Sequence, residues 1–299
     1  MPFAFEHSDA NVEDGLRRIA GEQIDKALEE ASNPHADFDE TVHGLRRRCK
    51  NLRGLLRMVK PRLTVFEDED AAVSGIATRL SQARDAAVML MTLDKLVLAK
   101  GGGPPVIDAA DHKQLHDLLA ERERGMAQHM DQAGLFAEFS EAMLAMRGRV
   151  EGWALERKKF GGIAEGIEAT YRRLRERMAD AAADEAPLLM HAWRKQAKYH
   201  RHHVMLLRRH APDEMNGRSK LLGELGDLLG DHHDLAVLIE VLNGRAVGAP
   251  AALAKLTSLA SERQKGLSDK AFALGRQVAA EKPRALTERL RQYWMLEAA

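Results

Sequence analysis

Residues that favour β-strands are scarce in this sequence. Aromatic side chains make up only 5% of its 299 residues, and Val, Ile and Thr are thinly spread. These are the residue types enriched in strands. The chain is rich instead in Ala, Leu, Glu, Arg, Met and Gln, which are good helix formers. Since 45% of the residues are hydrophobic, it also has enough apolar surface for a folded core. We therefore expect an all-α protein.

Cysteine is nearly absent as well. Cys49 is the only one, so no disulfide can form within the chain. The sequence has no apolar stretch of the length that crosses a bilayer. Its first twenty residues include four acidic side chains and lack the apolar core of a secretion signal. These features predict a soluble, cytoplasmic protein.

An overall excess of charge is also missing, because 45 Lys and Arg residues balance 45 Asp and Glu residues. This balance hides a strong segregation along the chain. Residues 41–66 contain eight Lys and Arg and no acid, and residues 191–211 contain six and again no acid. Because local potential depends on where charges lie, the neutral total does not exclude binding of a polyanion.

Clusters of Pro, Gly and Ser divide the chain into helical segments. The clearest loop runs from Gly101 to Pro105. The acidic run Glu67 to Asp70 is typical of the first turn of a helix, where it favours the macrodipole. The expected helices are 12–31, 39–59, 68–100 with a break near residue 81, 109–131, 135–150, 163–183, 187–209, 214–243, 250–280 and 283–296.

Two motifs recur in the second half of the chain. The pattern HxxRxxxKxxR at residues 43–53 returns 148 residues later at residues 191–201, and residues 80–88 resemble residues 229–237 at an offset of 149. Chance does not readily place two motifs at nearly the same offset. We infer a duplicated unit of about four helices, with one repeat in residues 1–150 and the other in residues 151–299.

Each copy of the first motif places a cationic stripe on an amphipathic helix. At about 100° per residue, the basic side chains at 43, 46, 50, 53 and 57 fall within an arc of roughly 80°, and leucines lie opposite. Unpaired cations three and four residues apart repel one another. The stripes therefore need a counter-charge, which solvent, acids of a neighbouring helix or a phosphate-rich ligand would supply.

At these motifs the sequence resembles the CHAD family, the conserved histidine α-helical domain, over nearly its whole length. The elements at 43–53 and 191–201 resemble the family signature in both halves. Arg84-Asp85 and residues 228–234 resemble its second recurring element. Residues 166–177, which include Tyr171, resemble the first helix of its second repeat.

The resemblance implies two pseudo-symmetric four-helix bundles with a basic surface or channel at their junction that binds inorganic polyphosphate. Polyphosphate granules are an implied further partner and location. His43 and His191 are expected to donate hydrogen bonds and to gain protons beside the anion, so that affinity rises as the pH falls through the histidine range. The expected polyphosphate-binding residues are His43, Arg46, Arg47, Lys50, Arg53, Arg57, Arg84, Tyr171, Arg172, Arg175, His191, Arg194, Lys195, Lys198, Arg201 and His202.

Two departures from the family pattern weaken the second half as a cationic surface. His202 stands where an aromatic residue is expected, and His233 stands where the first half has Arg84. A histidine near its reference pKa is largely neutral at neutral pH.

Catalytic patterns are absent from the sequence, which has no Walker-type phosphate loop, GxSxG or HExxH. Some family members are fused to a triphosphate-hydrolysing domain of the CYTH type, and no strand-rich segment of that kind occurs here. We expect a binding protein that is not an enzyme and needs no cofactor. The sequence holds thirteen histidines, but no complete set of three or four zinc ligands stands out, and we expect no metal.

Nucleic acid is the main alternative ligand, and an acidic segment of a partner protein is the third. All three ligands offer an array of negative charge, and binding of phosphate arrays falls steeply with salt. Base recognition would use aromatic side chains among the basic ones, and these are few. The shortage favours polyphosphate.

Overall fold

The computed structural model describes residues 3–33, 35–82, 85–97, 107–128, 131–244 and 250–296. These ranges are helical, as the composition predicts, and contain no strand beyond an isolated bridge between Leu63 and Leu155. Two short 3-10 helices, η1 (Lys60–Arg62) and η2 (Phe160–Gly162), accompany the α-helices. The α-helices are α1 (Val12–Ala31), α2 (Phe38–Val59), α3 (Phe66–Gln82), α4 (Asp85–Val97), α5 (Ala109–Gln128), α6 (Gln132–Val150), α7 (Ala164–Ala183), α8 (Pro187–Leu206), α9 (Pro212–Asn243), α10 (Pro250–Val278) and α11 (Pro283–Leu296).

The helices begin at residues that the sequence marks as helix starts. The side chain of Asn11 accepts hydrogen bonds from two amides in the first turn of α1, and Asp37 and Asp131 cap α2 and α6 in the same way. Helices α8 to α11 each begin with a proline, whose missing N–H costs nothing at that position. The predicted break near residue 81 stays a prediction, because α3 is described to Gln82 and α4 from Asp85, and the two residues between them lie outside the described residues.

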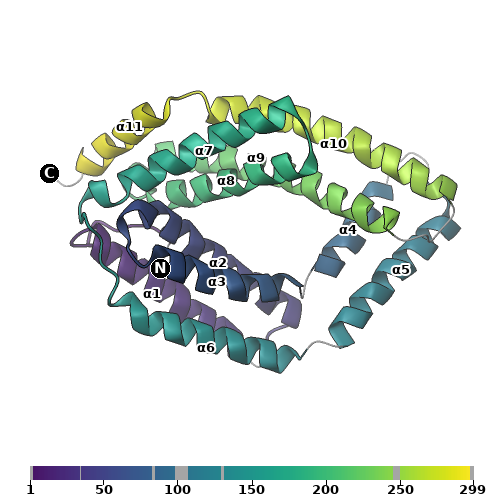
Figure 1. Cartoon of the computed structure of the whole chain (residues 1–299), viewed down its shortest axis with the longest axis horizontal. Coiled ribbons are helices and arrows are strands. Elements are labelled where there is room, and N and C mark those ends of the chain that lie inside the picture. The colour runs from purple at the N-terminus through teal and green to yellow at the C-terminus, as the bar shows by residue number, and fades with distance from the viewer. Residues whose placement is uncertain are drawn as a thin grey trace.

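Helices α1, α2, α3 and α6 pack together, and α7 to α10 form a second group that α11 joins through α7. Figure 1 shows α10 along one long edge of the molecule and α6 along the other. One hydrophobic core runs through both groups, and a smaller one joins α4 and α5 to the distal parts of α9 and α10. The division into repeats at residue 150 and their pseudo-symmetry stay predictions. No described helix is both long and apolar enough to cross a membrane.

Two glycines bring the helix groups into close contact. A β-carbon at Gly166 of α7 would lie 1.9 Å from the carbonyl oxygen of Met58 in α2. A β-carbon at Gly54 of α2 would lie 2.6 Å from that of His202 in α8. Only glycine lets the backbones approach so closely. Helix α2 therefore lies directly against α7 and α8, and the two basic helices meet.

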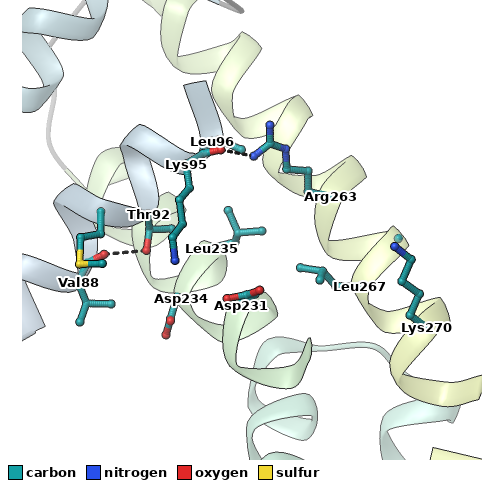
Figure 2. A pocket seen from close by; sticks show the side chains of 12 residues that line it. Val88, Thr92, Lys95, Leu96, Asp231, Asp234, Leu235, Arg263, Leu267 and Lys270 are labelled. Atoms are coloured by element: carbon teal, nitrogen blue, oxygen red, sulfur yellow. Dashed lines mark hydrogen bonds between the residues drawn. The ribbon is translucent and has the colours of Figure 1, made fainter. Parts of the chain in front are cut away.

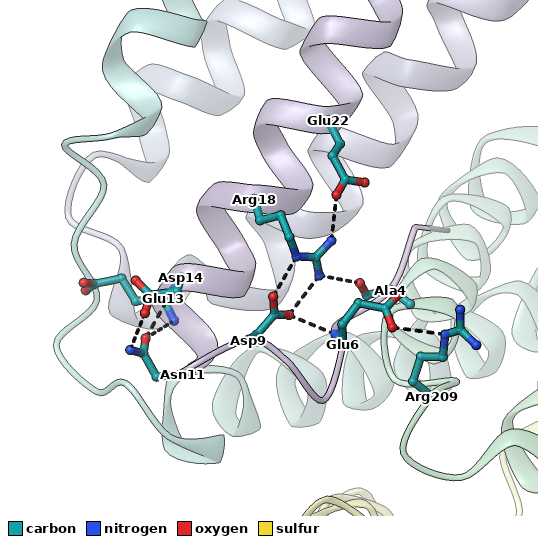
Figure 3. Close-up of polar contacts among 9 residues, drawn as sticks. All are labelled: Ala4, Glu6, Asp9, Asn11, Glu13, Asp14, Arg18, Glu22 and Arg209. Carbon is teal, nitrogen blue, oxygen red and sulfur yellow. Dashed lines mark hydrogen bonds and ion pairs between the residues drawn. The ribbon is translucent and has the colours of Figure 1, made fainter. Parts of the chain in front are cut away.

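The segment before α1 fastens the same junction from one end. Arg18 donates hydrogen bonds to both carboxylate oxygens of Asp9 and to the carbonyl of Ala4 (Figure 3). Glu6 forms an ion pair of 3.3 Å with Arg209, just beyond the end of α8. The backbone N–H of Phe5 donates to the carbonyl of Leu206. The N-terminal segment thus ties the first helix group to the second.

Candidate anion-binding site

The first basic stripe faces a small pocket between α2 and α3. The pocket has a volume of about 180 Å³. Leu45 and Leu52 lie buried on the opposite face of α2, as the helical periodicity predicts. Cations on one wall and hydroxyls on the other suit an anion the size of a phosphate group. The polar lining residues are Arg46, Lys50, Arg53, Ser74, Thr78 and Ser81.

Asp70 of α3 holds two arginines of this stripe in place. Arg53 reaches both of its carboxylate oxygens, with N···O distances of 2.9 and 3.3 Å, and Arg57 donates to it over 2.7 Å. Burial acts to raise the pKa of Asp70, but the hydrogen bonds and charges of the two arginines outweigh it and lower the pKa overall. Acids of a neighbouring helix therefore supply the counter-charge for part of the first stripe.

The second stripe forms no such ion pair among the described residues. The side chains of Arg194, Lys195, Lys198 and Arg201 form no hydrogen bond or ion pair with any residue that the structure describes. Burial lowers the pKa of Lys198 to about 7, and the charges of Arg194 and Lys50 add to this effect. Burial also lowers the pKa of Arg194, whose Nε is enclosed without a partner. A partly buried cation without an ion-pair partner destabilises a fold, and the carboxylates of Asp227 and Asp234 act on Lys198 only through their charge. A bound anion would therefore stabilise this region.

Glycines of α9 make room for two of these arginines. A β-carbon at Gly230 would lie 3.2 Å from Nη2 of Arg194, and one at Gly223 would lie 3.5 Å from Cζ of Arg201. Carboxylates of α9 lie near enough to act electrostatically on Arg194, but none forms an ion pair with it. The guanidinium groups therefore lie flat across α9 and keep their donors unused. The three carboxylates are those of Asp227, Asp231 and Asp234.

Cations of the two stripes act on one another across the contact between α2 and α8. Lys50 lowers the pKa of both Lys198 and His202, while Arg53 and Arg57 lower that of Lys195. In each case burial is the larger cause. We call this set the junction cations: Arg46, Lys50, Arg53 and Arg57 of α2, with Arg194, Lys195, Lys198 and Arg201 of α8.

Three histidines near the junction cations have lowered pKa values. The rings of His191 and His233 lie 4.4 Å apart. Burial, followed by the charge of Arg194, lowers the pKa of His191, and burial lowers the pKa of His233 and of His202 to about 4. In the free protein the pKa of His191 lies below its ordinary value, and the expected gain of a proton beside a bound anion stays a prediction.

Comparison with known proteins identifies the family of the chain and proteins of similar fold. The family model of the CHAD domain matches residues 18–243. The chain belongs to the CHAD family. Its fold is similar to that of PptA from Streptomyces chartreusis, with a TM-score of 0.62 and 16% identity over 91% of this chain and 100% of that one. It is also similar to the CHAD domain from the plant Ricinus communis, with a TM-score of 0.55 and 21% identity over 99% and 96% of the two chains. No curated protein sequence matches the chain.

The structure places several of the expected CHAD site residues away from the junction cations. Arg47 turns toward α1 and pairs with Glu30 at 3.4 Å, because it lies to one side of the stripe. Arg172 and Arg175 line a different pocket, between α7 and the adjoining ends of α10 and α11. His43 is exposed one turn before Arg46. Arg84 lies outside the described residues.

Tyr171 needs a correction. Its side chain is fully buried, and its hydroxyl donates to the carbonyl oxygens of Val278 and Glu281 at 3.0 and 2.9 Å. The guanidinium of Arg218 lies over its ring. The residue therefore joins α7 to the end of α10 in the core and cannot contact a ligand at the surface of the CHAD fold.

Sequence reasoning missed Asp70 and the glycines of α9. Asp70 was one acid in a run interpreted as a helix start, and α3 does begin there, but its side chain points into the fold toward Arg53. The spacing of Gly223 and Gly230 was a usable signal. It equals the seven-residue spacing of Arg194 and Arg201 on the helix that packs against α9.

Proposed function

We propose that the protein binds inorganic polyphosphate at the junction cations and that it is a binding protein without catalytic activity. The observation that carries this proposal is the pair Arg194 and Lys198. Both are largely buried, and neither has an ion-pair partner among the described residues. The nearby carboxylates of α9 form no ion pair with either residue, so a bound anion would supply the missing partner.

The binding mode follows from the placement of the cations. One phosphate group occupies the pocket bounded by Arg46, Lys50 and Arg53. The chain then continues over α8, where Lys198 and the arginines beside it contact the next phosphate oxygens through charge-assisted hydrogen bonds. Asp70 keeps Arg53 and Arg57 in fixed orientations, which lowers the entropic cost of ordering them on binding. His43, His191 and His202 serve as hydrogen-bond donors at the margins.

The aromatic side chains near the junction cations support a ligand without bases. Among the described residues here, Tyr199 is buried, and both Tyr199 and Phe66 lie under the guanidinium of Arg57. Neither ring offers a face on which a nucleobase could stack. A single-stranded nucleic acid would therefore gain only its phosphate contacts, which polyphosphate supplies at higher density.

The location of the protein belongs to this proposal. We expect it in the cytoplasm, where polyphosphate granules would be its largest binding surface. Nucleic acid and acidic protein segments are weaker competitors for the same cations.

A competition titration at one fixed salt concentration tests the proposal. Polyphosphate, single-stranded RNA and an acidic peptide are each titrated against the protein. Polyphosphate should bind at least about tenfold more tightly than either competitor, a difference of roughly 1.4 kcal/mol. Equal or tighter binding of RNA or of the peptide would overturn it.

Two variants locate the site in the same assay. Combined Arg46→Glu and Arg194→Glu replacement should abolish polyphosphate binding and leave the helical circular dichroism unchanged. Arg175→Glu is the matched control, because it reverses a charge in the separate pocket beside α7 and should leave binding unchanged. If the control loses binding to the same extent, the junction cations are not the site.

A further inference from the structure

A second cavity lies between α4, α9 and α10, outside the set of junction cations. Its volume is about 540 Å³, within the range of roughly 300–1,000 Å³ that small-molecule sites occupy. Part of its wall is apolar, and Met91, with 55% of its surface exposed, lies at the edge. The apolar lining residues are Val88, Met91, Leu96, Leu235 and Leu267.

Charged groups of both signs face this cavity without pairing. Lys95 extends from α4 and Asp231 from α9 toward the space between the three helices, and Lys270 stands on the α10 wall (Figure 2). These three side chains form no ion pair or hydrogen bond with any described residue, and the same holds for Asp234. Arg263 differs, because it donates to the backbone carbonyl of Lys95. The cavity thus offers two unused ammonium groups and two unused carboxylates.

This mixture of groups restricts the chemistry of an occupant. A bare phosphate chain would pair with the lysines but would be repelled by Asp231 and Asp234. It would also leave the apolar side chains of the wall in contact with water. An apolar anion would leave the partly buried carboxylate of Asp234 without a donor, which costs free energy. A polyamine would be repelled by the ammonium groups of the two lysines. The occupant needs an anionic group, several hydroxyl or amino donors and a flat apolar body.

We propose that this cavity binds a nucleoside monophosphate. Its phosphate pairs with Lys95 and Lys270, and its ribose hydroxyls or base amino group donate to Asp231 and Asp234. Carboxylates recognise ribose hydroxyls in this way in dinucleotide-binding folds. The base packs against the apolar wall formed by Leu235 and Leu267. This site shares no residue with the junction cations, although Asp231 and Asp234 also act electrostatically on Arg194, and variants at the two places test it separately from polyphosphate binding.

Calorimetric titration of the full chain with AMP tests the proposal. Adenosine, inorganic phosphate and phosphoethanolamine are titrated separately as partial ligands. AMP should bind at least about tenfold more tightly than each of them, because it alone satisfies all three parts of the cavity. Failure of AMP to bind, or binding of inorganic phosphate with equal affinity, would overturn the proposal.

Gly266 of α10 offers a variant that blocks the cavity. It lines the cavity, and a β-carbon added there would meet no atom within 4 Å. Gly266→Phe should therefore fill the space without disturbing the fold and should weaken AMP binding at least about tenfold. Gly217→Phe on α9 is the matched control, since that glycine also faces open space but does not line the cavity.

A third variant separates the cavity from the junction cations. Lys50→Glu should weaken polyphosphate binding and leave AMP binding unchanged, while Gly266→Phe should do the reverse. If AMP binding follows Lys50 and is insensitive to Gly266→Phe, AMP is occupying the junction cations and the cavity proposal is wrong.

Discussion

Arg194 of α8 lies across Gly230 of α9, so that a β-carbon on the glycine would come within 3.2 Å of its Nη2 atom. Arg201 stands in the same relation to Gly223, seven residues away on both helices. The two arginines of α8 and the two glycines of α9 therefore have the same seven-residue spacing, and each arginine side chain lies over a glycine. This match keeps the guanidinium groups beside Lys198, where they can act together on one anion.

Enlarging Gly230 should displace Arg194 and weaken binding. We expect Gly230→Leu to reduce polyphosphate affinity about tenfold, measured by calorimetry, and to cost about 1–3 kcal/mol of stability, since Gly230 is buried and the larger side chain overpacks the contact with Arg194. Gly217→Leu on the exposed part of α9 should leave affinity unchanged. An unaltered affinity in Gly230→Leu would show that Arg194 does not contact the ligand.

Removing the charge of Asp70 should affect both stability and binding. Asp70→Asn leaves Arg53 and Arg57 without their shared carboxylate, and we expect the free energy of unfolding to fall by about 2 kcal/mol, less than for a fully buried pair because the arginines are partly exposed. Polyphosphate affinity should fall severalfold as the two arginines lose their orientation. Chemical denaturation and titration measure the two effects. Asp68→Asn, on the exposed side of the same helical turn, should change neither.

The same carboxylate predicts a loss of stability in acid. Because the pKa of Asp70 is lower in the folded protein than in the unfolded chain, its contribution is fully present above the unfolded pKa of about 3.9 and is lost as the pH falls through the folded value. Wild-type stability should therefore decline below about pH 4 more steeply than that of Asp70→Asn. Parallel declines would show that Asp70 is not held as a carboxylate.

Polyphosphate affinity should depend on pH through Lys198. With a pKa of about 7, Lys198 is charged below neutrality and loses its proton as the pH rises. Binding of an anion favours the charged form, so above pH 7 the complex must take up a proton and affinity falls. Lys198→Arg should remove this dependence between pH 6 and 9, because arginine stays protonated. Calorimetry in buffers of different ionisation enthalpy measures the proton uptake directly.

His191 provides the control for this assignment. Its pKa is lowered by burial and by neighbouring cations, so it holds a proton less readily than an ordinary histidine. His191→Gln should leave the pH profile of wild type intact. Loss of the profile in His191→Gln, with its retention in Lys198→Arg, would restore histidine as the titrating group.

Local sequence patterns were enough to predict the helices and the two basic stripes. The stripes follow from a fixed rotation per residue, and helix starts such as Asn11 and Pro187 are set by their own side chains. The meeting of the stripes is different, because it depends on Gly54 and His202 approaching across two helices. The sequence of one helix does not show which of its glycines will contact a neighbouring helix.

Side-chain roles were harder to predict than positions. Arg46 and Arg47 are adjacent in sequence, yet one lines the pocket beside α3 and the other pairs with Glu30 of α1. Tyr171 lies in a segment that resembles a family motif, but its side chain is buried in the core. Burial decides these cases, and it is a property of the packed helices that the linear pattern does not contain.

The most direct test of the account is Lys198→Met, measured for both polyphosphate affinity and stability of the free protein. A cation that serves binding but has no ion-pair partner in the fold should lower the free energy of unfolding of the free protein. We therefore predict that the variant loses at least about tenfold in affinity while its free energy of unfolding rises by about 1 kcal/mol. Unchanged affinity, or a loss of affinity accompanied by a loss of stability, would contradict the account.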